Sequence, residues 1–363
     1  MAKRNKRKGL GHFLFGITTR TIMLMNAGVL LLSYLSMYVN PAKAWFMTVF
    51  GLLFFPFFII NICFLLSAAS RGSRSYVIPL LALLPSLFLI GRYVQFNKVQ
   101  DDGGEGITIV SYNVGAFDLY PEKSGLSSRE ECIEAVMAFL KECDADILSL
   151  QEFYVPKGED VKEYVSRYFP DRNVEYYTSI DGDGAFGNVI ITRFPVLGKD
   201  KFDFEDSANL ALYADLSVDG RTFRVYNCHF QSYSVSVPGV LKGIAGKDDT
   251  IVAETEEKMR KSIGLRPQQV DAVLDDIKAS SVEVIVTGDF NDTPMSYTYN
   301  QLKRGRKDSF IEAGRGLGGT YSLLWPFVRI DYVLYPDNVT AVSHKVEREK
   351  FSDHYPVITR LKL

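Results

Sequence analysis

GDFNDTP, residues 288–294, directly follows the apolar run VEVIV at residues 282–286. Such a run is typical of a buried strand, so Asp289, Asn291 and Asp292 are expected at the rim of a sheet. Carboxylate and amide oxygens in that place suit a hard cation and a phosphate. The same string also makes an ordinary turn that merely ends a strand. For this segment taken alone, both interpretations stay open.

Charge divides the chain into two unlike parts. The 363 residues carry a net charge of -2, yet the first 98 hold eleven Lys and Arg and no acid. The remainder has 30 basic against all 43 acidic residues, a formal charge of -13. The four cysteines form no CxxC pair and no zinc spacing with histidine. The composition therefore indicates a basic, apolar front end joined to an acidic globular domain.

Three apolar runs precede residue 97, at residues 21–39, 44–69 and 76–96. Each is about as long as a helix needs to cross a hydrocarbon core. A signal peptide would explain only one run, and buried helices of a soluble protein are the other alternative. We predict three transmembrane helices in a membrane anchor, residues 1–98.

Basic residues near these runs predict the orientation in the membrane. The short loop between the first and second runs, residues 40–43, has one Lys. The segment before the first run and the segment between the second and third runs hold more basic residues: Lys3, Arg4, Lys6, Arg7, Lys8, Arg71 and Arg74. Positive ends inside mean a cytoplasmic N-terminus and a globular domain on the extracytoplasmic side. Arg92 and Lys98 count against this orientation.

A polar, glycine-rich linker at residues 99–106 precedes a domain at residues 107–363. Strands are expected at residues 107–114, 147–152, 174–179, 188–192, 210–216, 222–230, 282–287, 330–335 and 355–361. A capping box of Ser128 and Glu131 predicts a helix that follows it, and further helices are expected at residues 161–168 and 267–277. Residues 232–262 are expected to be a loop or insertion. Strands with interspersed helices favour mixed sheets covered by helices.

Eight polar residues fall at or near the ends of these expected strands. They are Asn113, Glu152, His229, Asp289, Asn291, Asp331, Asp353 and His354. Any one of them has a structural explanation, since a lone strand-end Glu is usually solvated and a lone His usually packs. However, the chain has only four histidines, and two of them lie in such positions. We therefore expect a site at one edge of the sheets.

Here the sequence resembles the endonuclease/exonuclease/phosphatase superfamily of magnesium-dependent phosphodiesterases and phosphatases. The matching pieces are SYNV (111–114), LQE (150–152), GNVIITRFP (187–195), NCHF (227–230), GDFNDTP, RIDYVL (329–334) and SDHYPV (352–357). They occur in the family's order across the whole soluble part. The resemblance implies an α/β (α+β) four-layer sandwich, in which two mixed β-sheets are flanked by helices.

The resemblance also implies roles for residues of this chain. Glu152 resembles the principal Mg²⁺ ligand, with Asn113 and Asp353 nearby and Mn²⁺ as an alternative ion. Asp289 is expected to orient or deprotonate the attacking water, and Asn291 to donate a hydrogen bond to the phosphate. His354, oriented by Asp331, is expected to contact the phosphate, with His229 as general acid or second donor. Asn188 is a further candidate for phosphate contact.

Differences between this sequence and individual branches of the family reduce the number of substrate classes that we expect. Inositol polyphosphate 5-phosphatases usually carry an Arg after GDxN and a Cys-Asp-Arg signature. This chain has Asp292 after GDFN and the residues Arg329-Ile330-Asp331, so that branch is disfavoured. The histidine of NCHF, His229, is a point at which this chain resembles deoxyribonucleases, sphingomyelinases and lipid-directed members of the family. An acidic domain is a poor polyanion binder, so we expect a lipid or lipid-linked phosphate ester as substrate. A membrane-tethered nuclease acting on DNA or RNA is the alternative, and a catalytically silent membrane scaffold is the non-enzyme alternative. The sequence indicates no protein partner.

Overall fold

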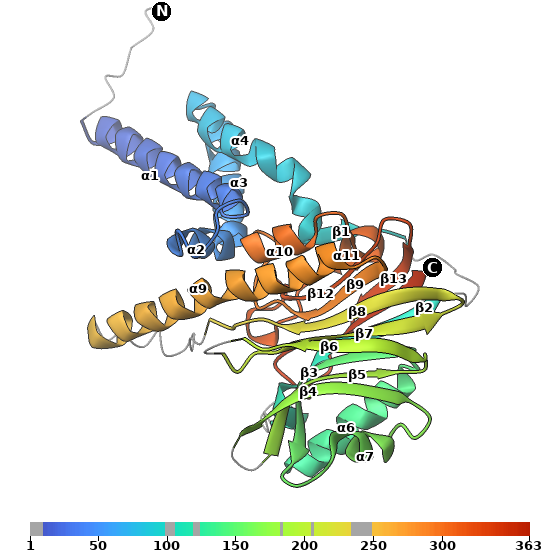
Figure 1. Ribbon diagram of the computed structural model, residues 1–363. Coiled ribbons are helices and arrows are strands. Elements are labelled where there is room, and N and C mark those ends of the chain that lie inside the picture. The colour runs from blue at the N-terminus through green and yellow to red at the C-terminus, as the bar shows by residue number, and fades with distance from the viewer. Residues whose placement is uncertain (1–9, 99–105, 119–123, 182–183, 205–206, 234–248) are drawn as a thin grey trace, which may run out of the picture.

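The computed structural model describes residues 10–98, 106–118, 124–181, 184–204, 207–233 and 249–363. Figure 1 shows two β-sheets stacked in the globular domain, with a group of helices projecting from one end. The predicted linker at residues 99–106 lies almost wholly outside the described residues.

Each large sheet has six strands. The first sheet has the order β13, β14, β2, β3, β5, β4, with bounds Thr340–Val346, Val357–Lys362, Ile107–Asn113, Ile147–Pro156, Gly184–Thr192 and Asn173–Asp181. The second sheet has the order β10, β12, β9, β8, β7, β6, with bounds Lys307–Asp308, Asp331–Tyr335, Glu283–Asp289, Arg221–His229, Ala211–Val218 and Val196–Phe202. The pairs β2–β3 and β8–β9 are parallel and the other pairs are antiparallel, so both sheets are mixed.

Helices cover the outer face of each sheet. Helices α6 (Arg129–Glu142) and α7 (Val161–Ser166) pack on the first sheet through residues such as Val136 and Val165. Helices α9 (Asp249–Ala279) and α10 (Tyr297–Leu302) pack on the second sheet through Val270, Val273 and Leu302. A third apolar core, which includes Ile109 and Val225, lies between the sheets. The predicted four-layer arrangement is confirmed.

The capping box ahead of α6 is present. The Ser128 hydroxyl accepts a hydrogen bond from the Glu131 amide at 3.2 Å. The Glu131 carboxylate accepts one from the Ser127 amide, at 2.8 Å, rather than from Ser128 as in the simplest form of the motif. The first bond satisfies an amide that the first helical turn leaves without a partner, and the second ties the chain before the N-cap to that turn.

Some elements of the domain were missed, and one expectation was wrong. The strands β6 and β13 were not predicted; the sequence of β6, VLGKDKF, is mostly exposed and has the lysines of an edge strand. Residues 249–262 were expected to belong to a loop or insertion, but they form the first part of α9. The rest of that expectation, at residues 234–248, lies outside the described residues.

The prediction of three transmembrane helices is corrected by the structure. Within the described residues, one straight helix, at residues 16–35 of α1 (Leu10–Leu35), is long and apolar enough to cross a bilayer. The second run is a pair of helices, α2 (Phe46–Leu52) and α3 (Phe54–Ser70), bent by 57°. At the third run, predicted at residues 76–96, the structure has a shorter apolar helical stretch at residues 74–88, which includes α4 (Val77–Leu83). Pro56 and Pro85 lie in the first turns of α3 and of the 3₁₀ helix η2 (Leu84–Phe88), since proline lacks the amide that an unbroken helix needs.

We name residues 10–92 the helical unit. The end of this unit that includes Ser36, Gly51 and Arg92 contacts the globular domain directly. The Ser36 hydroxyl donates to the Met295 carbonyl at 2.7 Å, and Arg92 Nη1 donates to the Pro294 carbonyl at 2.8 Å. Gly51 permits this approach, because a Cβ there would lie 2.7 Å from the Met295 oxygen. The strand β1 (Val94–Phe96) then pairs with β11 (Arg315–Leu317) of the domain. The helical unit therefore holds the segment that directly follows GDFNDTP.

One buried histidine makes the domain sensitive to acid. His344 Nδ1 bonds the Ser309 hydroxyl at 2.8 Å, while Nε2 is buried without a partner. Burial lowers the pKa of His344 from 6.5 to about 3. The unfolded chain takes up this proton near pH 6.5, so the free energy of unfolding falls as the pH drops below that value. The loss approaches about 1.4 kcal/mol per pH unit.

His344→Gln should flatten the dependence of the melting temperature on pH between 6.5 and 4.5, and an unchanged slope would refute this assignment.

Candidate active site

Strand register brings three predicted site residues to one level of the second sheet. β8 and β9 are parallel, so His229 and Asp289 at their carboxyl ends are direct partners. β12 is antiparallel to β9, and its first residue, Asp331, is also a partner of Asp289. Gly288 lets β9 approach β8 closely, since its φ is +127° and a Cβ would lie 1.9 Å from the Cys228 oxygen. The glycine of GDFNDTP is thus required by the backbone.

The first sheet supplies Asn113 from the carboxyl end of β2 and Glu152 from within β3, one residue after the parallel pairing of β3 with β2 ends. The pairing of β3 with β5 shifts register between Leu150 and Phe153, and Glu152 has a φ of +51°. A bulge of this kind re-aims a side chain, and a left-handed non-glycine residue stores backbone strain. The Glu152 side chain is 41% exposed, so it projects from the sheet rather than packing within it.

Asn113 joins the two sheets at the site. Its Nδ2 donates to Glu152 Oε1 at 2.9 Å and to Asp289 Oδ2 at 3.1 Å. His229 Nε2 lies 3.5 Å from the same Glu152 oxygen and 3.8 Å from the same Asp289 oxygen. The Asn113 oxygen accepts from the Gly115 amide at 3.0 Å. In this arrangement Asn113 is a donor to the carboxylates, and its role as a metal ligand stays a prediction.

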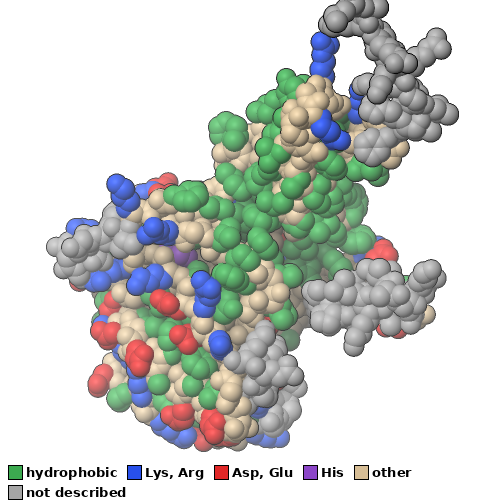
Figure 2. All heavy atoms as spheres, turned by 180° about the vertical axis from the view of Figure 1, so that it is seen from behind, with side chains coloured by type: hydrophobic (Ala, Val, Ile, Leu, Met, Phe, Trp, Pro, Cys, Tyr) green, Lys and Arg blue, Asp and Glu red, His purple; other side chains and the backbone are tan. Residues whose placement is uncertain are grey.

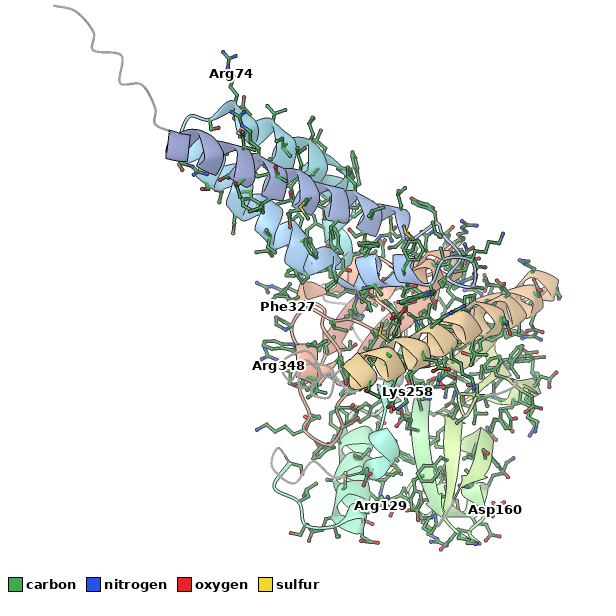
Figure 3. All side chains as sticks on the ribbon, turned by 90° about the vertical axis from the view of Figure 1, so that its left-hand side faces the viewer. Arg74, Arg129, Asp160, Lys258, Phe327 and Arg348 are labelled. Carbon is green, nitrogen blue, oxygen red and sulfur yellow. The ribbon has the colours of Figure 1, made fainter. Side chains whose placement is uncertain are left out.

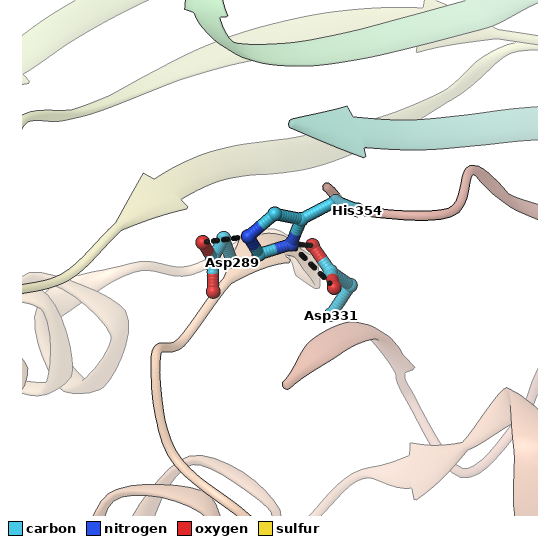
Figure 4. Close-up of side chains that lie close together, drawn as sticks. All are labelled: Asp289, Asp331 and His354. Carbon is cyan, nitrogen blue, oxygen red and sulfur yellow. Dashed lines mark hydrogen bonds and ion pairs between the residues drawn. The ribbon is translucent and has the colours of Figure 1, made fainter. Parts of the chain in front are cut away.

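His354 lies between two carboxylates (Figure 4). Its Nδ1 is 3.0 Å from Asp331 Oδ2, and its Nε2 is 3.6 Å from Asp289 Oδ2. Burial lowers the pKa of His354, but the charges of Asp331 and Asp289 more than offset this and raise the pKa well above 6.5. The ring is therefore an imidazolium at neutral pH. It presents one N–H to Asp331, which orients it, and the other toward Asp289.

Burial also raises the pKa of Asp289, against the lowering effect of the His354 charge. A carboxylate with a raised pKa is a better proton acceptor near neutral pH. Asn291, two residues further along the chain, has a φ of +50° and donates from Nδ2 to the Phe230 carbonyl at 2.9 Å. Its second contact, to Asp289 Oδ2 at 3.3 Å, is longer. A phosphate oxygen would replace that second bond if Asn291 acts as predicted.

The donor set fits a divalent cation. Among the described residues, no Lys or Arg pairs with Glu152, Asp289, Asp331 or Asp353, and only two histidines offset these carboxylates. Asp289, Asp331 and His354 could hold a cation, since their ligand atoms lie within 4.8 Å of one another. However, the protonated His354 already balances that group. Glu152 and Asp353, which line the same cavity, are the better oxygen ligands for a hard ion.

Asn188 lines the same cavity as Glu152 and Asp353. Its Nδ2 donates to the carbonyls of Leu210 and Asn227, at 2.9 and 3.2 Å. The Asn188 oxygen is buried without a hydrogen-bond partner. Contact between Asn188 and a phosphate would require the side chain to exchange one of these bonds, and its role stays a prediction.

The structure adds polar residues beneath the site that carried no assigned role. Gln151 Nε2 donates to Asn227 Oδ1 at 2.8 Å, and the Ser149 and Thr287 hydroxyls share a bond of 2.6 Å. These buried pairs link the two sheets directly below Glu152 and Asp289. In the sequence these residues stand out as polar positions in apolar strands: Gln151 and Asn227 lie within LQE and NCHF, and Ser149 and Thr287 directly precede LQE and GDFN.

A second buried network supports the loop after β9. Arg266 of α9 pairs with Asp292 at 3.0 Å and stacks over the Tyr233 ring. Tyr233 in turn donates to Asp292 Oδ1 at 2.8 Å. Asp292, which the sequence placed at the rim of the sheet, is therefore a structural partner of Arg266. Its role could not be inferred from GDFNDTP alone, because Arg266 comes from another element.

The site residues open into one large cavity of about 1200 Å³. Its polar part includes Glu152, His229, Asp289, Asn291 and His354, and Asp353 lies there too. Its remaining walls are largely apolar and include residues of the helical unit. The arrangement can bind a phosphate ester beside an imidazolium, a carboxylate base and a cation site.

Comparisons with known proteins agree with this geometry. Residues 110–354 match the model of the Endonuclease/Exonuclease/phosphatase family, and the chain belongs to that family. Residues 13–93 match a domain of unknown function, DUF8431. No protein of curated function matches the sequence.

Solved structures share the fold of the domain. An endonuclease/exonuclease/phosphatase from Bacteroides vulgatus is 20% identical, with a TM-score of 0.52, and the match covers 71% of this chain and 99% of that one. A mannosyl-6-phosphatase from Bacteroides thetaiotaomicron is 17% identical, with a TM-score of 0.51 and coverage of 71% and 100%. The human Nocturnin catalytic domain with bound sulfate is 16% identical, with a TM-score of 0.51 and coverage of 70% and 94%.

Proposed function

We propose that this protein is a membrane-anchored, metal-dependent phosphoesterase that hydrolyses a lipid or lipid-linked phosphate ester. The observation that carries the proposal is the convergence of Glu152, His229, Asp289 and His354 on one cavity, where Glu152 and Asp353 offer oxygen ligands to a cation. Family membership supports hydrolysis of phosphate esters as the class of reaction. The Mg²⁺ requirement and the lipid substrate are our inferences.

Each residue has a definite task in this mechanism. Asp289, whose pKa is raised, accepts the proton of the attacking water. The His354 imidazolium donates from Nε2 to a phosphate oxygen, and Asp331 keeps its ring in place. His229 donates to the leaving oxygen or to a second phosphate oxygen. A bound Mg²⁺, held by Glu152 and Asp353, would supply Lewis-acid polarisation of the phosphoryl group.

The exposed surface of the helical unit supports membrane insertion. Large apolar side chains on its outside include Ile22, Met25, Leu31, Ile60, Leu66, Leu81 and Phe88. Figure 2 shows that hydrophobic side chains cover much of this unit, whereas acidic side chains gather on the globular domain. Such a surface is costly in water and favourable in hydrocarbon.

The domain is expected on the extracytoplasmic side. Figure 3 shows Arg74 at the end of the helical unit farthest from the domain, as cytoplasmic positive charge requires. A C-terminal alkaline phosphatase fusion in a bacterial host should be active, and a fusion at Gly72 should be inactive. The reverse activities of the two fusions would refute this topology.

The substrate class is tested with purified full-length protein and Mg²⁺ on phospholipid vesicles, DNA, RNA and inositol phosphates. We expect turnover of a lipid phosphate ester to exceed that of the nucleic acids, since a domain of charge -13 repels polyanions. Faster turnover of DNA or RNA would support the tethered nuclease instead. Absence of hydrolysis on every substrate would favour the silent scaffold.

A further inference from the structure

The cavity at the active site has two chemically different halves. One half holds the carboxylates and histidines already described. The other half is formed by a segment of the helical unit, by Tyr93 directly after that unit, and by the loop at residues 321–328, and we name it the apolar half. Its lining residues are Leu52, Leu53, Phe55, Pro56, Tyr93, Tyr321, Leu323, Leu324, Trp325, Phe327 and Val328. None of these side chains is charged.

The helical segment and the loop of the apolar half meet directly. The ring of Phe55, in the first turn of α3, lies 4.7 Å from the ring of Phe327, centroid to centroid. Phe55 also packs against Tyr93, at 5.7 Å. Figure 3 shows Phe327 beside the end of the helical unit that faces the domain. One wall of the cavity is thus part of the helical unit itself.

Several side chains of the apolar half are exposed although they are large and hydrophobic. Leu324 is 43% exposed, Phe327 46% and Leu53 39%. Apolar surface of this size, gathered on one cavity, marks a binding site more often than a bare surface. The wall continues into the exposed apolar face of α3, at Ile59 and Ile60. A molecule could therefore contact this wall and the bilayer together.

We propose that the apolar half binds the hydrocarbon chains of a phosphorylated membrane lipid whose phosphate lies at His229 and His354. This inference rests on the proposed function and adds the substrate's binding mode to it. The helical unit then forms part of the substrate site, beyond its role as an anchor. A phosphate at one end of the cavity and an uncharged wall at the other match the two ends of such a lipid.

Photolabelling tests the proposal without requiring turnover. Full-length protein in phosphatidylcholine vesicles receives phosphatidic acid with a diazirine in its acyl chain, and labelled peptides are located by mass spectrometry. We expect label in residues 52–56 and 321–328. Diacylglycerol with the same chains should label these peptides less, because it has no phosphate to hold at the histidines. Equal labelling by both probes would mean mere contact with the bilayer and would overturn the proposal.

Polar variants make the test specific to the cavity. Leu324→Asn and Phe327→Asn should each lower phosphatidic acid labelling of residues 52–56 roughly tenfold, as expected when contact with a large apolar side chain is lost. Leu197→Asn is the matched control, since Leu197 is 62% exposed on β6 and outside the cavity. Unchanged labelling in both cavity variants refutes the proposal. Loss of a dimer in them, measured by size in detergent, would assign the surface to self-association and refute it as well.

The two proposals fail in distinguishable ways. If no substrate of the panel is hydrolysed but labelling falls in the Leu324 and Phe327 variants, lipid binding in the apolar half is supported and the catalytic proposal is refuted. If hydrolysis occurs but labelling is unchanged in both variants, only the proposal of lipid binding in the apolar half is refuted.

Discussion

His229→Ala and His354→Ala are each expected to lower kcat at least about a hundredfold, with little change in folding. The structure places both rings against the same Asp289 oxygen, at 3.8 and 3.6 Å. Two donors on opposite sides of one phosphate would act on the same transition state. A single preorganised donor is worth roughly 2.7–4 kcal/mol in comparable sites. Turnover and melting temperature are measured on the same preparations.

Coupling between the histidines gives a second, sharper outcome. The double variant should lose less than the product of the two single losses, because groups that act as a unit are not additive. Asp331→Asn should resemble a milder His354 defect, since the ring remains and only its orienting carboxylate is lost. If His229 is merely a packing residue, His229→Ala would lower the melting temperature while the folded fraction keeps its full rate. That result would remove His229 from the mechanism.

Glu152→Gln is expected to abolish nearly all hydrolysis, and EDTA should do the same to the unchanged protein. The substitution keeps the size of the side chain and removes one anionic oxygen from a site whose carboxylates pair with no Lys or Arg in the part of the chain that the structure describes. Metal affinity and the stabilisation of transition-state charge should both fall. The change should be visible as weaker Mg²⁺ binding by calorimetry as well as in turnover.

A surface glutamate provides the control for this experiment. Glu163 lies on α7, is exposed and is far from the cavity lining, so Glu163→Gln should leave turnover and Mg²⁺ binding unchanged. Full activity of the Glu152→Gln variant, or of wild-type protein in EDTA, would contradict the metal assignment.

The sequence predicted where the site lies because strand ends can be recognised locally. His229 and Asp289 follow apolar runs, and the parallel pairing of β8 with β9 then makes them partners. Asp331 and His354 were also expected at or near strand ends, and the motifs of the family supplied their roles. Four layers followed from the same resemblance and from the mixture of strands and helices.

What the sequence could not predict depends on contacts between distant segments. The bulge at Glu152 and the orientation of the Asn188 amide are set by neighbouring strands, not by local preference. At residues 44–69 the apolar length indicated a span and Pro56 indicated a kink, but neither gave the break after Leu52 or the bend of 57°. The docking of Arg92 on Pro294 joins residues 202 apart in sequence, and no local signal marks it.

Hydrolysis in ¹⁸O-labelled water tests the central claim most directly. Full-length protein with Mg²⁺ is incubated with the phospholipid vesicles, and the products are analysed by mass spectrometry. Water activated by Asp289 should attack phosphorus, so each turnover should place one ¹⁸O in the phosphate product and none in the alcohol. Label in the alcohol, or label in the phosphate that persists in EDTA, would contradict a metal-dependent phosphoesterase at this site.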